Sequence, residues 1–109
     1  PEKIDYAIER YSNEARRIYG VINQQVRDHA YLAGDEYTIA DIATYPWLRS
    51  AANQGVDWAD FPHAKRWFDE IDARPAVKRG CAMLEQMRQP LIGDQARNVL
   101  FGGQQYQKR

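Results

Sequence analysis

Apolar side chains recur every three or four residues between Glu2 and His29, at Ile4, Ile8, Tyr11, Ala15, Ile18, Ile22 and Val26. This spacing marks one face of an α-helix, and the other positions are mostly Glu, Arg, Asn and Gln. At ~1.5 Å per residue the helix would be about 40 Å long. Gly20 lies inside it at a cost of about 1 kcal/mol relative to Ala, so we expect a close neighbouring backbone or a bend there.

A second helix is predicted over Ile39–Gln54, because Thr38 and Asp41 have the spacing of a capping box. The Thr oxygen can accept a hydrogen bond from the N3 amide, that of Asp41, while the Asp carboxylate accepts one from the Thr38 amide. This helix is apolar nearly all round, which is typical of the middle of a helical bundle. Pro46 predicts a bend within it, and Gly55 suits the position after its end.

Two more helices are predicted, Pro62–Ala73 and Pro75–Arg88, each with proline in its first turn. Glu70 and Arg74 are spaced to form an i,i+4 ion pair. A short helix is expected over Asp94–Phe101. With no alternating strand pattern, the fold class is all-α, a helical bundle at 1–89 followed by an extension at 90–109 that ends in a mobile tail.

Length and charge narrow the function classes. The 109 residues suffice for one domain. The 15 Lys and Arg residues balance 15 Asp and Glu residues and are scattered, which argues against a nucleic-acid partner or an anionic membrane surface. No apolar run approaches the ~20 residues that cross a bilayer, and the start lacks a signal-peptide pattern. The single Cys81 fits a reducing compartment, so a cytoplasmic location is expected.

Few residues offer chemistry of their own. Two histidines and one cysteine have no metal-ligand spacing, so no metal is expected, and no known catalytic motif predicts a catalytic residue in this chain. The group Tyr6, Arg10 and Tyr11 combines one guanidinium with two phenols, which could hold a carboxylate. The alternative interpretation is a surface arginine paired with Glu14 at i,i+4.

The run over 31–43 (YLAGDEYTIADIA), followed by Tyr45-Pro46-Trp47, resembles the C-terminal helical domain of the cytosolic glutathione transferases. In that family a central helix with Ser or Thr at its N-cap and Asp at N3 is a folding signature. The segments 61–67 and 73–77 fit the same pattern. With the run YAIERY at 6–11, the chain looks like the bacterial Nu-class enzymes and their fungal prion-protein relatives.

The resemblance implies a glutathione transferase that conjugates a small electrophile or reduces a disulfide substrate, and that forms a homodimer. Glutathione would be held mainly by an N-terminal thioredoxin-like domain, of which this sequence shows no trace. The chain is therefore expected to be a fragment that also lacks the first helix of the helical domain and is inactive alone. Loss of a neighbouring helix would expose apolar surface, so the piece should self-associate or bind another surface.

The resemblance also suggests roles for single residues. Arg10 would reach the glutathione carboxylate held by the other subunit. Thr38 and Asp41 would be structural, and the co-substrate pocket would be lined by Tyr6, Tyr11, Tyr45, Trp47 and Phe101. Core packing is the stronger interpretation for Tyr45 and Trp47. A different class stays open, because the same fold also serves as a noncatalytic helical interaction module.

Overall fold

The longest helix, α1, covers Asp5–Asp28 in the computed structural model, which describes residues 3–83, 85, 93, 98–100 and 102. It lies within the segment predicted to be helical. The chain turns to an extended conformation at His29, which ends the helix. Arg66 then donates to the carbonyl oxygens of Val26 and His29 at 2.7 and 3.1 Å, which supplies partners that the end of a helix lacks.

The second helix, α2, covers Ile39–Leu48 and is shorter than the predicted Ile39–Gln54. Pro46 cannot donate a backbone hydrogen bond to the preceding turn, and the α-helical pattern ends two residues later. A short 3₁₀ helix, η1 (Ala51–Gln54), continues the chain, and Gly55 closes it at φ 70°. Gly55 therefore follows the end of this 3₁₀ helix instead of one long α-helix, in the left-handed conformation that favours glycine.

The remaining helices begin where proline predicts. After the 3₁₀ helix η2 (Trp58–Asp60), α3 covers Pro62–Asp72 and α4 covers Pro75–Ala82. The α-helical pattern of α4 ends at Ala82, before the predicted end near residue 88, and Met83 lies in a turn. The expected domain boundary at 89 lies outside the described residues. Of the helix expected over 94–101, residues 98–100 are described and are helical.

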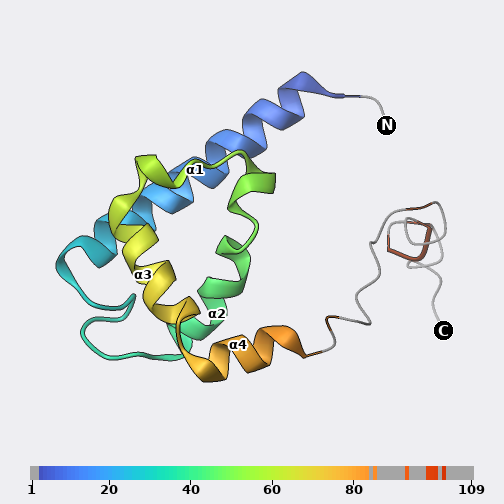
Figure 1. Cartoon of the computed structure of the whole chain (residues 1–109). Helices are drawn as coiled ribbons and strands as arrows, with labels where there is room; N and C mark the ends of the chain where they lie inside the picture. Colours follow the sequence, from blue (N-terminus) through green and yellow to red (C-terminus); the bar gives the residue numbers. More distant parts are fainter. Residues whose placement is uncertain (1–2, 84, 86–92, 94–97, 101, 103–109) are drawn as a thin grey trace, which may run out of the picture. The chain divides into compact units, whose positions relative to one another are not determined.

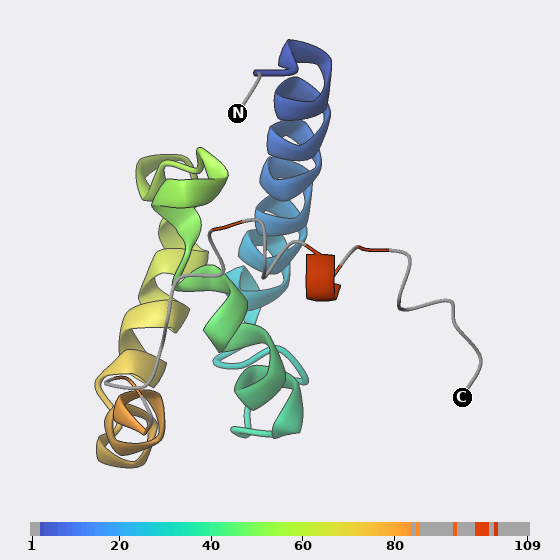
Figure 2. The same cartoon turned by 90° about the vertical axis from the view of Figure 1, so that its right-hand side faces the viewer.

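The core is built around α3, which packs against α1 and α2. Ala64, Trp67 and Ile71 of α3 have no exposed surface. Phe61, which precedes α3, offers no side-chain cap. Instead, the Asn23 side-chain oxygen on α1 accepts from the first two amides after Pro62, at 2.9 and 3.0 Å. This contact joins the two helices that Figure 2 shows running past each other.

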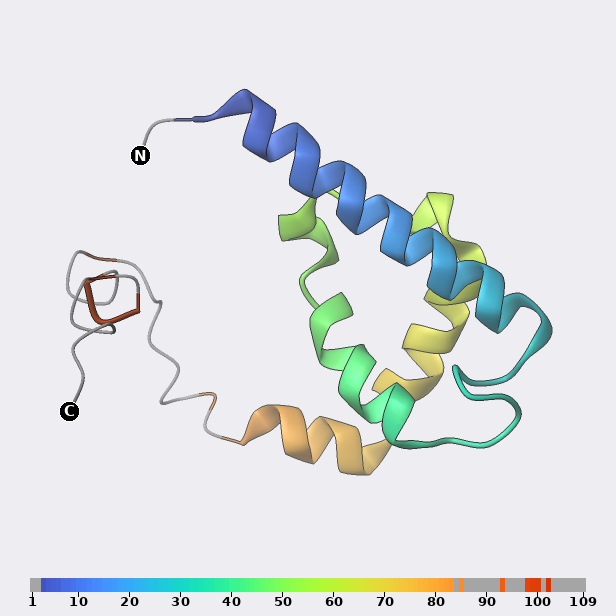
Figure 3. The same ribbon diagram turned by 180° about the vertical axis from the view of Figure 1, so that it is seen from behind.

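The chain divides into two units, residues 1–78 and 79–109, of which the first holds the core. The all-α fold class is confirmed: the described residues form helices, and their β-type pairing is a single bridge between Tyr31 and Gly34. In that same part of the chain no helix has the length and apolar character needed to cross a membrane. Within the first unit, the N-terminal turns of α1 extend beyond α2 and α3 (Figures 1 and 3).

Candidate functional site

The first turns of α1 carry an open hollow of about 690 Å³, lined by Tyr6, Glu9, Arg10, Tyr11, Asn13, Glu14 and Arg17. All the lining residues come from one helix, where positions three and four apart are neighbours. The structure thus brings together the three residues of the carboxylate-binding hypothesis. The phenols of Tyr6 and Tyr11 are 74 and 72 % exposed.

The charge pairing around Arg10 differs from the alternative raised by the sequence. Glu14 accepts from Arg17, with 2.8 Å between donor and acceptor at each of its two oxygens. These hydrogen bonds lower the pKa of Glu14 most, and the positive charge of Arg10 acts in the same direction. No ion pair within 4.0 Å joins Arg10 to a described acid. The alternative interpretation, an ion pair between Arg10 and Glu14, is therefore not found among the described residues, although the charge of Arg10 still acts on Glu14.

A second concavity, of about 550 Å³, runs between α1 and α2. We call it the α1–α2 groove; it is lined by Tyr11, Glu14, Ala15, Ile18, Tyr19, Ile22, Ala43, Thr44, Trp47, Leu48 and Gln54. The prediction that Trp47 packs in the core is wrong, because its side chain is 74 % exposed on the wall of the groove. The groove is mainly apolar and shares Tyr11 with the hollow around Arg10. It can accept an apolar or aromatic group.

Tyr45 lies elsewhere. It is buried, its ring stacks on Phe68 with 4.9 Å between centroids, and its hydroxyl donates to an Asp72 oxygen. It lines neither of the two concavities described above, and core packing is its role. Phe101, the other residue expected in the pocket, lies outside the described residues.

Thr38 and Asp41 form the predicted capping box at the start of α2. Thr38 Oγ1 accepts from the Ala40 amide at 3.2 Å, and Asp41 Oδ2 accepts from the Thr38 amide at 2.9 Å. The Asp41 side chain has no exposed surface, and its Oδ1 also accepts from the Leu32 amide at 3.0 Å and from Trp67 Nε1 at 2.8 Å. Burial raises the pKa of Asp41, but these hydrogen bonds outweigh it and hold the pKa below its usual value. The carboxylate is therefore fully engaged in structure.

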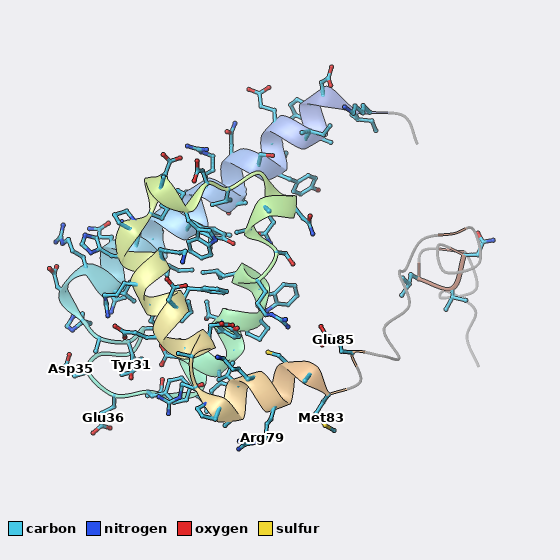
Figure 4. All side chains as sticks on the ribbon, viewed as in Figure 1. Tyr31, Asp35, Glu36, Arg79, Met83 and Glu85 are labelled. Carbon is cyan, nitrogen blue, oxygen red and sulfur yellow. The ribbon has the colours of Figure 1, made fainter. Side chains whose placement is uncertain are left out.

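The Asp41 carboxylate also fixes the loop between α1 and α2, through Leu32. The ring of Tyr31 meets Tyr37 edge-on at 5.6 Å, and the Arg74 guanidinium lies 3.9 Å from the centre of the Tyr37 ring. Figure 4 labels Tyr31, Asp35 and Glu36 on this loop, away from the N-terminal turns of α1. The loop supports the fold and lies apart from the two concavities.

Sequence reasoning did not identify Ile18, Ala43 and Asn23 as important. Ile18 belongs to the apolar stripe of α1 and Ala43 to the apolar helix α2, and both line the groove. The signal was present in the apolar character of α2 all round, which exceeds what one buried face needs. Asn23 had no local signal, because the amides it caps lie 40 and 41 residues away. Within the described part of the chain no group of three His, Cys, Asp or Glu residues could hold a metal ion.

Known proteins resemble this chain in sequence over most of its length. The family model "Glutathione S-transferase, C-terminal domain" matches residues 3–75. The disulfide-bond oxidoreductase YghU of Escherichia coli is 45 % identical over 87 residues, covering 73 % of this chain and 30 % of that protein. The disulfide-bond oxidoreductase YfcG of the same organism is 42 % identical over 85 residues, covering 78 % of this chain and 39 % of that protein.

Solved structures agree. A glutathione transferase from Burkholderia graminis, with two glutathione molecules bound per subunit, superimposes with a TM-score of 0.66 at 38 % identity, over 72 % of this chain and 35 % of that one. A Pseudomonas fluorescens family member with two glutathione molecules bound gives 0.63 at 40 % identity, over 72 % of this chain and 37 % of that one. The chain thus spans well under half the length of these relatives. It belongs to the family of glutathione transferase C-terminal domains.

Proposed function

We propose that this chain is the helical part of a cytoplasmic, homodimeric glutathione-dependent enzyme of the Nu class. Residues 1–89 make up the helical domain and 90–109 an extension. The group that activates the glutathione thiol belongs to the remainder of the enzyme, so the chain alone is inactive. Its own contribution is a guanidinium for the glutathione carboxylate and one wall of the co-substrate site.

The observation that carries this proposal is the state of Arg10. Its neighbour Glu14 is paired with Arg17, so Arg10 has no ion-pair partner within 4.0 Å among the described acids. A guanidinium matches a carboxylate with two parallel hydrogen bonds. Tyr6 and Tyr11, exposed on either side in the same hollow, can add hydroxyl donors.

Disulfide reduction is the reaction class that the relatives favour. Two of them carry the name disulfide-bond oxidoreductase, and two solved structures hold two glutathione molecules. Reducing one disulfide bond consumes two glutathione thiols and yields two product thiols and glutathione disulfide. Two bound glutathione molecules match that stoichiometry. Conjugation, which consumes one glutathione per electrophile, is the second reaction of the proposed enzyme.

The α1–α2 groove is the proposed wall of the co-substrate site. The groove and the hollow around Arg10 are adjacent, since Tyr11 lines both of them. Trp47 offers an exposed indole face to an apolar or aromatic group. A co-substrate in the groove would therefore lie near a glutathione anchored at Arg10.

The test is Arg10→Ala in the dimeric enzyme that carries this chain. Hydrogen bonds to charged groups contribute about 1.5–3 kcal/mol, so we expect glutathione affinity, measured by calorimetry, to fall by roughly 10- to 100-fold. Arg10→Lys keeps the positive charge but loses the bidentate geometry of the guanidinium. Its glutathione affinity should therefore lie between those of the native enzyme and Arg10→Ala. Thermal stability should change little, because Arg10 makes no ion pair with a described acid.

The matched control is Arg27→Ala, a change of the same residue type on the same helix about 25 Å away. Arg27 pairs with Asp28 and lies far from the hollow, so glutathione affinity should be unchanged. If Arg10→Ala also leaves the affinity unchanged, the role of Arg10 in glutathione binding fails. If the enzyme also fails to reduce a disulfide probe with glutathione as the reductant and fails to bind glutathione, the noncatalytic interaction module is the better interpretation.

A further inference from the structure

The hollow at the first turns of α1 carries charges of both signs. Two of its lining residues are acids and two are bases. Glu14 and Arg17 bind each other through two hydrogen bonds of 2.8 Å each. Glu9 and Arg10 are both exposed, and neither has an ion-pair partner within 4.0 Å among the described residues. The hollow therefore presents one carboxylate and one guanidinium that no ion pair in the described part of the chain uses.

Helix geometry explains why these two charges do not pair with each other. Adjacent positions on an α-helix point about 100° apart, so Glu9 and Arg10 do not face each other as residues four apart do. Both nevertheless line the same hollow, which they border from two sides. A ligand that carries an anionic and a cationic group close together can therefore contact both residues at once.

Two polar neighbours lie beside both charges. Tyr6 precedes Glu9 by three residues and Arg10 by four, and Asn13 follows Glu9 by four residues and Arg10 by three. Residues at these spacings are neighbours on a helix, and Tyr6 and Asn13 both line the hollow. The phenol and the amide nitrogen can donate to a carboxylate, and the amide oxygen can accept from an ammonium group. We call Tyr6, Glu9, Arg10 and Asn13 the charge-pair site.

Glutathione offers the matching pair of charges at only one of its two ends. Its glycine end carries a carboxylate with no cation beside it, whereas its γ-glutamyl end carries a carboxylate and an ammonium group on the same carbon atom. A lone carboxylate bound to Arg10 would lie near the negative charge of Glu9, which repels it. An ammonium group beside that carboxylate is attracted by Glu9 instead. The charges of the site therefore favour the γ-glutamyl end.

We propose that the charge-pair site binds the γ-glutamyl end of glutathione, with its α-carboxylate on Arg10 and its α-ammonium group on Glu9. Glu9 is then a specificity-determining residue. The inference rests on the proposed function, which assigns a glutathione carboxylate to Arg10, and adds which end of the molecule that carboxylate belongs to. The glycine carboxylate is not used by this site. The substrate class is therefore γ-glutamyl thiols, including those whose glycine is esterified, amidated or missing.

Calorimetry with three ligands tests the proposal in the enzyme that carries this chain. The ligands are glutathione, deaminated glutathione, in which hydrogen replaces the α-ammonium group, and the glycine ethyl ester of glutathione. The ester should bind as tightly as glutathione. The deaminated analogue should bind about 2- to 5-fold more weakly, the range expected for losing one exposed ion pair. Glu9→Gln should weaken glutathione binding by the same factor but should not weaken binding of the deaminated analogue, because the two changes remove the same contact.

The matched control is Glu36→Gln, which removes an exposed acid on the loop that Figure 4 labels and should leave all three affinities unchanged. Equal weakening of glutathione and of the deaminated analogue by Glu9→Gln, or weakening of neither, would overturn the role of Glu9. A loss of affinity for the ester as large as that caused by Arg10→Ala would assign the glycine end to Arg10 and overturn the proposal. Failure of the proposed function is a separate result, because it requires that Arg10→Ala leave glutathione affinity unchanged.

Discussion

Asp41 offers the sharpest test of what holds this domain together, through the substitution Asp41→Asn. The carboxylate has no exposed surface and accepts from the Leu32 amide, the Thr38 amide and the Trp67 indole. Asparagine keeps the shape but removes the charge and turns one acceptor oxygen into a donor. If its oxygen takes the place of Oδ1, its NH₂ group faces the Thr38 amide, so two donors oppose each other.

The magnitude follows from those contacts. Orphaning one buried donor costs about 1–3 kcal/mol, and the hydrogen bonds from Leu32 and Trp67 lose the strengthening that the negative charge gave them. We expect Asp41→Asn to lower the free energy of unfolding by about 2–4 kcal/mol. Since small domains have about 5–15 kcal/mol in total, this is a large loss. For a domain of this size the midpoint of thermal unfolding should fall by roughly 4–8 °C per kcal/mol.

Urea unfolding followed by circular dichroism measures the loss, provided that the m value stays constant. Asp57→Asn is the matched control, because Asp57 is exposed and its side chain accepts, among the described residues, only from the Ala59 amide, at 2.9 Å. Asn and Asp are equally good at such N-caps, so the control should change stability by less than about 0.5 kcal/mol. If Asp41→Asn cost no more than the control, the argument that Asp41 joins α2, the loop and α3 would be wrong.

The same carboxylate predicts a pH dependence. Burial raises the pKa of Asp41, but the hydrogen bonds prevail, so the folded-state pKa lies below the usual 3.8. The unfolded chain then binds the proton first as pH falls. The contribution of Asp41 is complete above pH 3.8 and is lost as pH drops through the lower folded-state pKa. The difference in free energy of unfolding between the native chain and Asp41→Asn should therefore decrease below pH 3.8. A difference that stays constant with pH would contradict the lowered pKa of Asp41.

Three further changes have expected outcomes in the same unfolding assay. Asn23→Ala removes the side chain that caps α3 and should cost about 1–2 kcal/mol, whereas Asn23→Asp should retain most of the stability; an Ala variant as stable as the native chain would refute the cap. Gly20→Ala should stabilise by roughly 0.5–1 kcal/mol, because a Cβ there would lie an ordinary 4.0 Å from the Phe61 ring; destabilisation would show that the space is tighter. Gly55→Ala should cost about 1 kcal/mol, because residue 55 has φ 70°, and a neutral result would mean that the turn relaxes.

Arg10 shows how far sequence reasoning reached at the candidate site. The grouping of Arg10 with Tyr6 and Tyr11 was visible, because Tyr6 lies four residues before Arg10 on the same helix and Tyr11 follows Arg10 directly. Its alternative, a bridge to Glu14, was equally consistent with spacing. Glu14 pairs with Arg17 and not with Arg10. Side-chain positions decide between these two partners, and sequence spacing does not determine them.

Local interactions were readable from the sequence for a physical reason. The capping box, the helix starts at proline and the left-handed Gly55 each depend on residues within four positions, whose geometry the backbone fixes. The apolar stripe of α1 belongs to the same class. These features determined the fold class and the order of the helices.

Only the tertiary structure decided which groups meet across the chain. Glu70 pairs with Arg66 instead of the expected Arg74, whose guanidinium lies over the Tyr37 ring. Asn23 caps a helix 40 residues away, and the Trp67 indole completes the shell of Asp41. Such contacts depend on how rigid helices cross, and many sequences with the same periodicity would cross differently. For the same reason the exposure of Trp47 was settled by packing, which left its face of α2 uncovered.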